Sequence, residues 1–155
     1  MSKSIKITDD IYIDNSAIAY QCMTIKCTDH RQTHEQWKAD KVTGFYILNK
    51  KGNKMKFQDN AIIIDSDDVS FALVSCMASY GDTSFQGDFA TEIFKNSGSI
   101  VSAYGYKTST QYWVTQSVPP ILIPVKKGDV IDARLTGSLA GDYRILSCFL
   151  TVVLV

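Results

Sequence analysis

Apolar residues occupy both faces of the last stretch of the chain, residues 143–155 (YRILSCFLTVVLV). Read with a period of two, the even positions hold Leu, Cys, Leu, Val and Leu, and the odd positions are mostly apolar as well. Plentiful β-branched and aromatic residues favour a strand over a helix. An antiparallel strand with one wet face should alternate, so this pattern predicts a central strand that is covered on both sides. In so small a protein we expect one cover to be the domain's own core and the other to be a second subunit.

Shorter runs with strand character recur along the chain from residue 44 onward, separated by turn signals. The clearest runs are 45–48, 55–57, 61–64, 69–80, 89–95, 99–106, 111–118, 121–125 and 130–135. We expect Gly98 and Gly128 to take positive φ in tight turns, and Pro119-Pro120 to bend the chain. No long stretch has the period of a helix, so the sequence predicts an all-β sandwich or barrel.

The first 42 residues differ from this pattern and are expected to form an anchoring arm. Residues 1–20 have too few apolar side chains to fold alone and should be ordered by lying on something else. Residues 21–42 are the most polar part of the chain, and 28–38 are compatible with a short helix capped by Thr28 or with an extended linker. We therefore divide the chain into an arm, 1–42, and a domain, 43–155.

The composition is that of one folded domain. The 155 residues are 45% hydrophobic and 21% charged, with a formal net charge of +0, which argues against a nucleic-acid partner. No apolar stretch follows the first lysines, and the longest apolar run is short of the ~20 residues that span a bilayer, so we expect no secretory signal and no membrane insertion. The four cysteines are expected to be reduced, and those at 76 and 148 to be buried in strands.

The order of these segments resembles a C1q/TNF-like jelly roll. The resemblance covers residues 57–155 and rests on TEIFKNSGSIVSAYGY, on SVPPILIPVKKGDVIDARL and on the closing apolar strand. Domains of this family are jelly rolls that form compact homotrimers, with the C-terminal strand near the threefold axis. The resemblance implies an all-β jelly-roll sandwich, here with an extended N-terminal arm and no collagen-like or coiled-coil stalk. We assign the trimer interface to Tyr143, Ile145, Phe149, Leu150, Thr151 and Val153.

Two groups of residues have the side chains of metal ligands without the spacing of a metal site. The first group is Cys22, Cys27, His30 and His34, and the second is Asp65, Asp67 and Asp68. Zinc fingers place a long loop between the cysteine pair and the histidine pair, and here only two residues intervene. The aspartates lack the glycine and the distal glutamate of a calcium loop. We expect strand residues and a solvated acidic turn, and no metal or cofactor.

Catalytic motifs are not recognisable in the sequence. There is no G-x-S-x-G elbow, no H-E-x-x-H and no glycine-rich phosphate loop before a helix. The two histidines lie far along the chain from Cys76 and Cys148, so a cysteine–histidine nucleophile is not expected. We expect a protein that is not an enzyme.

Aromatic residues gather in or beside the expected loops of the domain. Tyr and Trp can pack one end of the side chain and hydrogen-bond with the other, which favours contacts with sugars and proteins. Other aromatic residues should fill the core or the subunit contacts. The candidate receptor contacts are Phe85, Tyr106, Tyr112 and Trp113.

The opening DIYIDNSAIAY also resembles the start of many phage tail and fibre proteins. We therefore expect a bacteriophage virion protein, made in the host cytoplasm: a trimeric head, neck or tail-fibre knob. Its arm would bind other virion proteins, and its far end would contact a host-surface glycan or protein. The alternative is a soluble bacterial C1q/TNF-like module that binds a glycan or a protein. An enzyme on a jelly-roll scaffold would need a convergent His/Glu set or a carboxylate pair, and neither is found.

Overall fold

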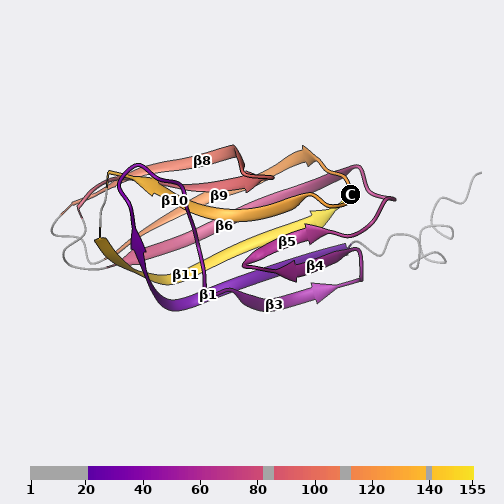
Figure 1. Cartoon of the computed structure of the whole chain (residues 1–155), viewed down its shortest axis with the longest axis horizontal. Helices are drawn as coiled ribbons and strands as arrows, with labels where there is room; N and C mark the ends of the chain where they lie inside the picture. The colour runs from indigo at the N-terminus through magenta and orange to yellow at the C-terminus, as the bar shows by residue number, and fades with distance from the viewer. Residues whose placement is uncertain (1–20, 82–85, 109–112, 139–140) are drawn as a thin grey trace, which may run out of the picture.

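Two antiparallel β-sheets pack face to face across a shared apolar core (Figure 1). The computed structural model describes residues 21–81, 86–108, 113–138 and 141–155, and this part of the chain contains no helix, so none that could cross a membrane. The strands are β1 (Gln21–His34), β2 (Asp40–Lys41), β3 (Tyr46–Lys51), β4 (Met55–Gln58), β5 (Ala61–Ile64), β6 (Phe71–Gly81), β7 (Gly87–Lys95), β8 (Gly98–Lys107), β9 (Trp113–Pro124), β10 (Val130–Gly137) and β11 (Gly141–Leu154).

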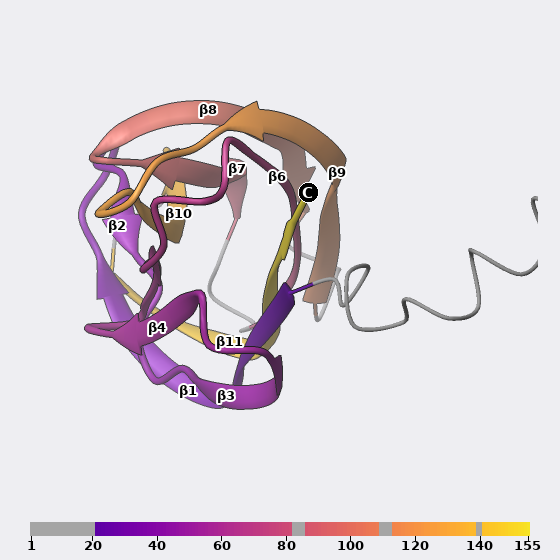
Figure 2. The same cartoon turned by 90° about the vertical axis from the view of Figure 1, so that its right-hand side faces the viewer.

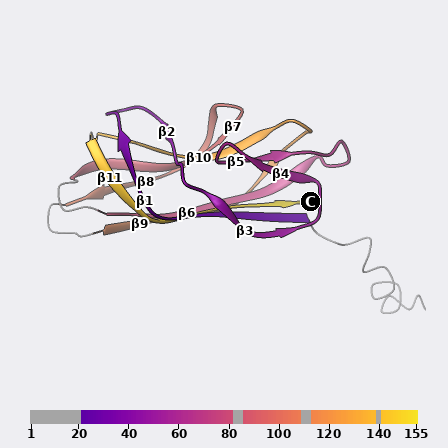
Figure 3. The same cartoon turned by 60° about the horizontal axis from the view of Figure 1, so that its bottom comes forward.

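The strand order is that of a jelly roll. One sheet, which we call the β11 sheet, runs β3-β1-β11-β6-β9, and the other, the β7 sheet, runs β4-β5-β10-β7-β8 with β2 beside β10. Figure 2 looks along the long axis and shows the sheets on opposite sides of the core, and Figure 3 shows them as two layers. The predicted all-β jelly-roll sandwich is confirmed.

The first described strand belongs to the domain and not to an arm. β1 pairs with β11 from Gln21 opposite Leu154 to His34 opposite Gly141, and its buried Met23 and Ile25 join the core. Our placement of residues 21–42 in an arm is therefore corrected, as is the helix or linker at 28–38. This segment becomes a strand because it pairs with a strand more than 100 residues away, and local composition does not reveal that pairing. Residues 1–20 lie outside the described residues.

The two ends of the sandwich differ. Gln21 and Leu154 are paired, so the first described residue and the C-terminus lie at one end (Figure 1). His34, Gly81, Lys107 and Gly137 end their strands at the other end, which we call the distal end. Because β1 and β11 each have 14 residues, the ends are separated by about 45 Å at the usual rise of a strand.

A register shift changes which residues of β11 face the core. Cys148, Leu150 and Val152, at even positions, are buried in the core. The pairing with β6 shifts between Ile145 and Ser147, and beyond the shift Tyr143 and Ile145 are buried instead. One extra residue in a strand moves all side chains beyond it to the other face, which is the effect of a β-bulge.

The strand β1 changes faces at the same level. Its residues in the core are Met23, Ile25 and Cys27 before the change, and the buried His34 comes after it. Asp29 lies between them with a φ of +50°, and its carboxylate pairs with Arg144 of β11. The two central strands thus bulge together and stay in register as far as the distal end.

Two turn expectations need correction. The runs before and after Pro119 and Pro120 are one strand, because β9 is continuous through them, and the prolines lie where its pairing with β6 shifts register. β9 lies at the edge of its sheet, where a residue without an N–H can be tolerated. In the β7–β8 hairpin the residues with positive φ are Asn96 (51°) and Ser97 (69°), while Gly98 already pairs with Lys95. This is the arrangement of a type I′ turn.

Polar side chains are buried within the distal end of the core. The Thr91 hydroxyl lies 3.1 Å from Tyr80 Oη and 2.8 Å from Gln116 Oε1, and Gln116 Nε2 donates to the Phe89 carbonyl. Burial raises the pKa of Tyr80 well above its ordinary value, so the phenol stays neutral. Gly105 leaves room for this network, because a Cβ there would lie 2.7 Å from Gln116 Nε2.

All four cysteines are free and buried, as expected for reduced thiols. The sulfurs of Cys76 and Cys148 are 3.9 Å apart on neighbouring strands. Burial raises the pKa of Cys27 to about 11, and the contact with Cys76, together with burial, raises that of Cys148. These thiols are therefore neutral packing groups.

Asp129 organises the turn that leads into β10. Its carboxylate accepts hydrogen bonds from Asn96 Nδ2 (2.7 Å) and from the N–H of Lys126 (3.0 Å), and lies 3.6 Å from Lys95 Nζ. Burial alone raises the pKa of Asp129, but these donors and the lysine charge outweigh it and hold the pKa below its ordinary value. Gly128 precedes it with a φ of +87°, which agrees with the prediction from the K-K-G-D turn.

Replacing Asp129 with Asn should lower the free energy of unfolding at neutral pH by about 1–3 kcal/mol, because the turn loses a charged acceptor. The folded pKa lies below the unfolded one, so this stabilisation is present above the ordinary pKa of 3.8 and is lost as the pH falls through the folded value. Urea unfolding of both proteins over that range should show the difference shrinking toward acid. A difference independent of pH would contradict this account.

Candidate functional surfaces

The outward face of the β11 sheet carries apolar side chains that the domain itself leaves uncovered. Strand pairing aligns them in two rows, of which one holds Val153, Leu73 and Leu122 and the other holds Phe149 and Met77. A polar row of Thr24, Thr151 and Ser75 lies between them. The two threonine hydroxyls are 3.0 Å apart, so one of them donates a hydrogen bond to the other. The result is an apolar face with a narrow polar band across it.

An exposed edge strand adjoins this face. All six residues of β3 are exposed, and three of them, Tyr46, Ile47 and Leu48, are large and apolar. β3 is also the last strand of its sheet within the described chain. Monomeric domains rarely leave both an apolar face and an apolar edge uncovered. The two surfaces are therefore candidates for contact between subunits.

The structure separates the residues assigned to the trimer interface into two sets. The side chains of Tyr143, Ile145 and Leu150 lie in the domain's own core, so they cannot touch a partner, and this part of the assignment is corrected. The side chains of Phe149, Thr151 and Val153 lie on the outward face, half-buried. The bulge before Ser147 changes the parity, which explains why Tyr143 and Ile145 were assigned to the wrong face. Leu150 follows the simple alternation with Cys148 and Val152, so its assignment to the interface did not need the bulge to fail.

Two of the predicted receptor contacts are exposed at the distal end. The side chain of Tyr106 is 54% exposed at the end of β8, and that of Trp113 is 60% exposed at the start of β9. Phe85 and Tyr112 lie outside the described residues. The described pair thus occupies neighbouring edge strands, one from each sheet.

The sequence did not single out two further exposed aromatic residues at this end. Tyr104 lies two residues before Tyr106 on β8, so both side chains point to the same side, and Tyr104 is 82% exposed. Trp37, in the turn between β1 and β2, is 64% exposed. Trp37 was assigned to the arm, and only the pairing of β1 brings it to the distal end.

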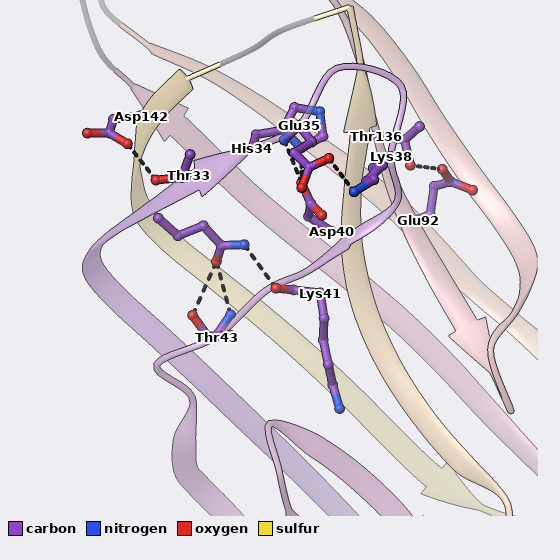
Figure 4. A network of polar contacts seen from close by, with 11 residues as sticks. Thr33, His34, Glu35, Lys38, Asp40, Lys41, Thr43, Glu92, Thr136 and Asp142 are labelled. Atoms are coloured by element: carbon purple, nitrogen blue, oxygen red, sulfur yellow. Dashed lines mark hydrogen bonds and ion pairs between the residues drawn. The ribbon is translucent and has the colours of Figure 1, made fainter.

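The turn that carries Trp37 is fixed by its flanking residues (Figure 4). Asp40 Oδ2 accepts a hydrogen bond from the N–H of Glu35 (2.9 Å) and lies 2.6 Å from Nδ1 of the buried His34. Glu35 also pairs with Lys38 through both side chains and backbone. These contacts hold a five-residue connection, 35–39, in one shape.

Trp37 has an unusual backbone conformation within this turn. Its φ is +60°, a region that bulky L-residues rarely adopt. The Trp37 N–H donates to the Gly137 carbonyl at 2.7 Å, which joins the turn to the end of β10. The turn therefore presents the indole to solvent beside the β7 sheet.

A nearly buried carboxylate lies on the outward face of the β7 sheet. Glu92 accepts hydrogen bonds from the hydroxyls of Ser99 (2.5 Å), Ser102 (3.0 Å) and Thr136. Figure 4 shows Thr136 and Glu92 turned toward one another. Three donors from two flanking strands thus solvate the charge in place of water.

The same face carries a second charged group. Arg134 donates two hydrogen bonds to Asp132, at 2.8 and 3.2 Å, and its guanidinium lies over the Phe94 ring at 4.2 Å. The arginine thereby covers Phe94, a large apolar side chain on this face. The outward face of the β7 sheet is thus polar and satisfied internally, unlike that of the β11 sheet.

The two groups of metal-ligand residue types do not converge. Cys22 and Cys27 lie on opposite faces of β1, and His30 Nε2 is hydrogen-bonded to Thr43 Oγ1 at 2.8 Å. The aspartates at 65, 67 and 68 each pair with a lysine, at 56, 127 and 54 respectively. Within the described part of the chain, no three His, Cys, Asp or Glu side chains are arranged to hold a metal ion.

Comparison with known proteins gives a fold and no sequence family. No family model and no curated protein matches the sequence. A crystal structure of murine APRIL at pH 5.0 matches with a TM-score of 0.65 and 11% identity, over 88% of this chain and 99% of that one. The PRD1 vertex protein P5 matches with a TM-score of 0.61 and 12% identity, over 86% and 95%. The globular domain of the zebrafish complement 1qA protein matches with 0.57 and 12%, over 84% and 94%.

This chain has a C1q/TNF-like jelly-roll fold. The expectation from its hairpin, its strand pair and its closing strand is confirmed. At these identities the likeness establishes the fold alone, so the role of the C1q/TNF-like domain has to be argued from its own surfaces.

Adding EDTA should leave the melting temperature unchanged, because lysines already compensate the acidic turn and the cysteines and histidines of β1 do not converge on one point. Differential scanning fluorimetry with and without the chelator measures this. A fall of several degrees that added Ca²⁺ or Zn²⁺ reverses would contradict it.

Proposed function

We propose that the chain is a structural protein of a bacteriophage virion, a homotrimeric knob whose distal end contacts the host surface. The observation that carries the proposal is the uncovered apolar face of the β11 sheet beside the exposed edge strand β3. C1q/TNF-like domains assemble as homotrimers with the C-terminal strand near the threefold axis, and β11 is the central strand of this face. The likeness to the PRD1 vertex protein P5 supports a place in the virion, on a head, neck or tail fibre.

The two apolar surfaces suit a ring of three subunits. A face on one subunit that contacts an edge on the next makes a head-to-tail interface, and such an interface closes into a ring when the rotation between subunits allows it. The face and the β3 edge are different surfaces of the same sheet, so each subunit can use both at once. A symmetric dimer would pair the face with itself and leave the edge exposed.

The position at which the chain leaves the described domain favours contact with the host through the distal end. The chain leaves the described domain at Gln21, at the end opposite Tyr106 and Trp113. An arm formed by residues 1–20 and bound to other virion proteins would therefore direct the distal end outward. Three copies of a weak contact then act together, since the second and third contacts are effectively intramolecular. The proposed role is binding and structural, without catalysis or a cofactor.

Light scattering of the purified protein should give about three times the chain mass of 17.3 kDa. Replacing Leu73 with Asp should yield folded monomers, because the charge would be buried unpaired at several kcal/mol per subunit. Ile63→Asp is the matched control, since Ile63 lies half-buried on the outward face of the other sheet, and it should remain trimeric. A native protein that is monomeric in solution would contradict the proposed homotrimer.

Alanine in place of Tyr106 or Trp113 should weaken binding of the labelled trimer to host cells, with the trimer mass unchanged. Monomeric Leu73→Asp should bind weaker by a factor of about 10²–10⁴, because it loses avidity. Flow cytometry measures both effects.

Mass spectrometry of purified source particles should detect the protein, and its absence there would contradict the virion assignment.

A further inference from the structure

Three exposed aromatic residues border small and polar side chains on the outward face of the β7 sheet, at its distal end. Strand pairing arranges that face in rows across β10, β7 and β8: Thr136, Ala90 and Tyr104 form one row, and Arg134, Glu92 and Ser102 form the next. Asp88 and Tyr106 continue β7 and β8 toward the end, with Ser138 hydrogen-bonded to Asp88. We call this surface, with Trp37 at its β10 side, the distal strip.

The register gives the distal strip its width. Trp37 is bonded to Gly137, which pairs with Phe89, and Phe89 pairs with Gly105, between the two tyrosines. Trp37 and the tyrosines are therefore separated by three steps between neighbouring strands, about 14 Å. Between them lies Ala90, the smallest side chain of its row. The surface between the aromatic borders is closed over Ala90, which is only 2% exposed, and presents the side chains of Thr136 and Asp88, so a short chain molecule can lie across it.

We propose that the distal strip binds a neutral oligosaccharide, with Trp37 and Tyr104 as the aromatic anchors. This deepens the proposed function and rests on it, since it names the chemical class that the distal end would recognise. Sugar rings present C–H groups that pack on aromatic faces, and hydroxyls that need donors and acceptors. Thr136 donates its proton to Glu92, so its oxygen is left to accept from a sugar hydroxyl, and the exposed Asp88 carboxylate adds an acceptor.

The charges of the strip argue for a neutral ligand. Its carboxylates are Glu92 and Asp88, and the cation of the neighbouring row, Arg134, is already engaged by Asp132 and by the Phe94 ring. These carboxylates would repel an anionic polymer, and the arginine that could offset the repulsion is already engaged. A protein anchor would need an apolar centre, and here the centre is Ala90 between hydroxyls and carboxylates.

The strip also stays accessible in the proposed trimer. Its rows are on the outward face of the β7 sheet, whereas the proposed subunit contacts use the β11 sheet and β3. The backbone of Trp37 supports a binding role as well. A bulky residue held at positive φ with most of its side chain in solvent gains little from packing, and strained conformations of this kind cluster at binding sites.

Tryptophan fluorescence tests the proposal directly, because the chain contains only two tryptophans. Trp113→Phe leaves Trp37 as the single reporter, and Trp37→Phe leaves Trp113. The probes are neutral gluco-, galacto- and manno-oligosaccharides of four to six units, with a sulfated oligosaccharide for comparison. We expect at least one neutral probe to shift the emission of Trp37 in a saturable way at millimolar concentration, and the sulfated probe to have no effect. If no neutral probe does so, the proposal is overturned.

Two variants then test the anchors with the oligosaccharide that binds. Trp37→Asn should weaken binding about tenfold or more, the loss expected for a central contact, without lowering the melting temperature, because Asn accepts positive φ more readily than Trp. Tyr104→Ala should act likewise. Ile63→Ala, which removes an apolar side chain from the outward face of the same sheet away from the distal end, is the matched control and should bind normally.

The outcomes separate this inference from the proposed function. Host-cell binding that is lost in Trp113→Ala but unchanged in Trp37→Asn and Tyr104→Ala would overturn the distal strip and keep the knob. If trimers bind cells but no neutral probe shifts the emission of Trp37, the distal strip is likewise overturned and the knob is kept. Loss of oligosaccharide binding in both strip variants, with the trimer mass and the melting temperature unchanged, would support the site.

Discussion

The structure depends on one constraint, namely that its C-terminal strand is apolar on both faces and lies in the middle of a sheet. β11 is paired on both sides, by β1 and by β6, over nearly its whole length. Its inward side chains, Cys148, Leu150 and Val152, form the centre of the core. The outward side chains continue into an apolar face that the neighbouring strands extend. A domain built around such a strand cannot leave this face in water without cost, so the need for a partner follows from the same residues that make the fold.

The outward faces of the two sheets differ in whether contacts within the sheet satisfy or cover their side chains. The β7 sheet satisfies its own polar groups: Glu92 is surrounded by hydroxyls, and Arg134 covers Phe94 while it binds Asp132. The β11 sheet has Lys26 over the Phe149 ring at 5.0 Å, and its other apolar residues have no comparable cover among the residues that the structure describes. One face is therefore largely polar, and the other is largely apolar. The proposed assembly and the proposed recognition thus use separate sheets, which allows both in the same molecule.

Alternation and turn chemistry predicted most of the strands from β3 onward, because those signals are local. The larger errors involve information that is not local, whereas the turn at Gly98 was a local misjudgement. β1 is polar in its second half, and only its pairing with β11 makes it a strand. The bulges at Asp29 and before Ser147 reverse the faces of Tyr143 and Ile145, and no residue type announces them. Trp37 was missed for the same reason, since its place at the distal end follows from the pairing of β1. The fold could thus be predicted, whereas the faces of its central strands could not.

The central claim, that a partner covers the outward face of the β11 sheet, is tested most directly by the oxidation of Met77. The side chain of Met77 is 42% exposed in the single domain, whereas Met23 and Met55 are buried in the core and serve as internal references. Thioether oxidation by dilute peroxide, followed by peptide mass spectrometry, reports access to each residue. The account predicts that Met77 in the native protein is protected nearly as well as Met23 and becomes reactive in folded, monomeric Leu73→Asp. Rapid oxidation of Met77 in the native protein, with Met23 and Met55 still protected, would contradict it.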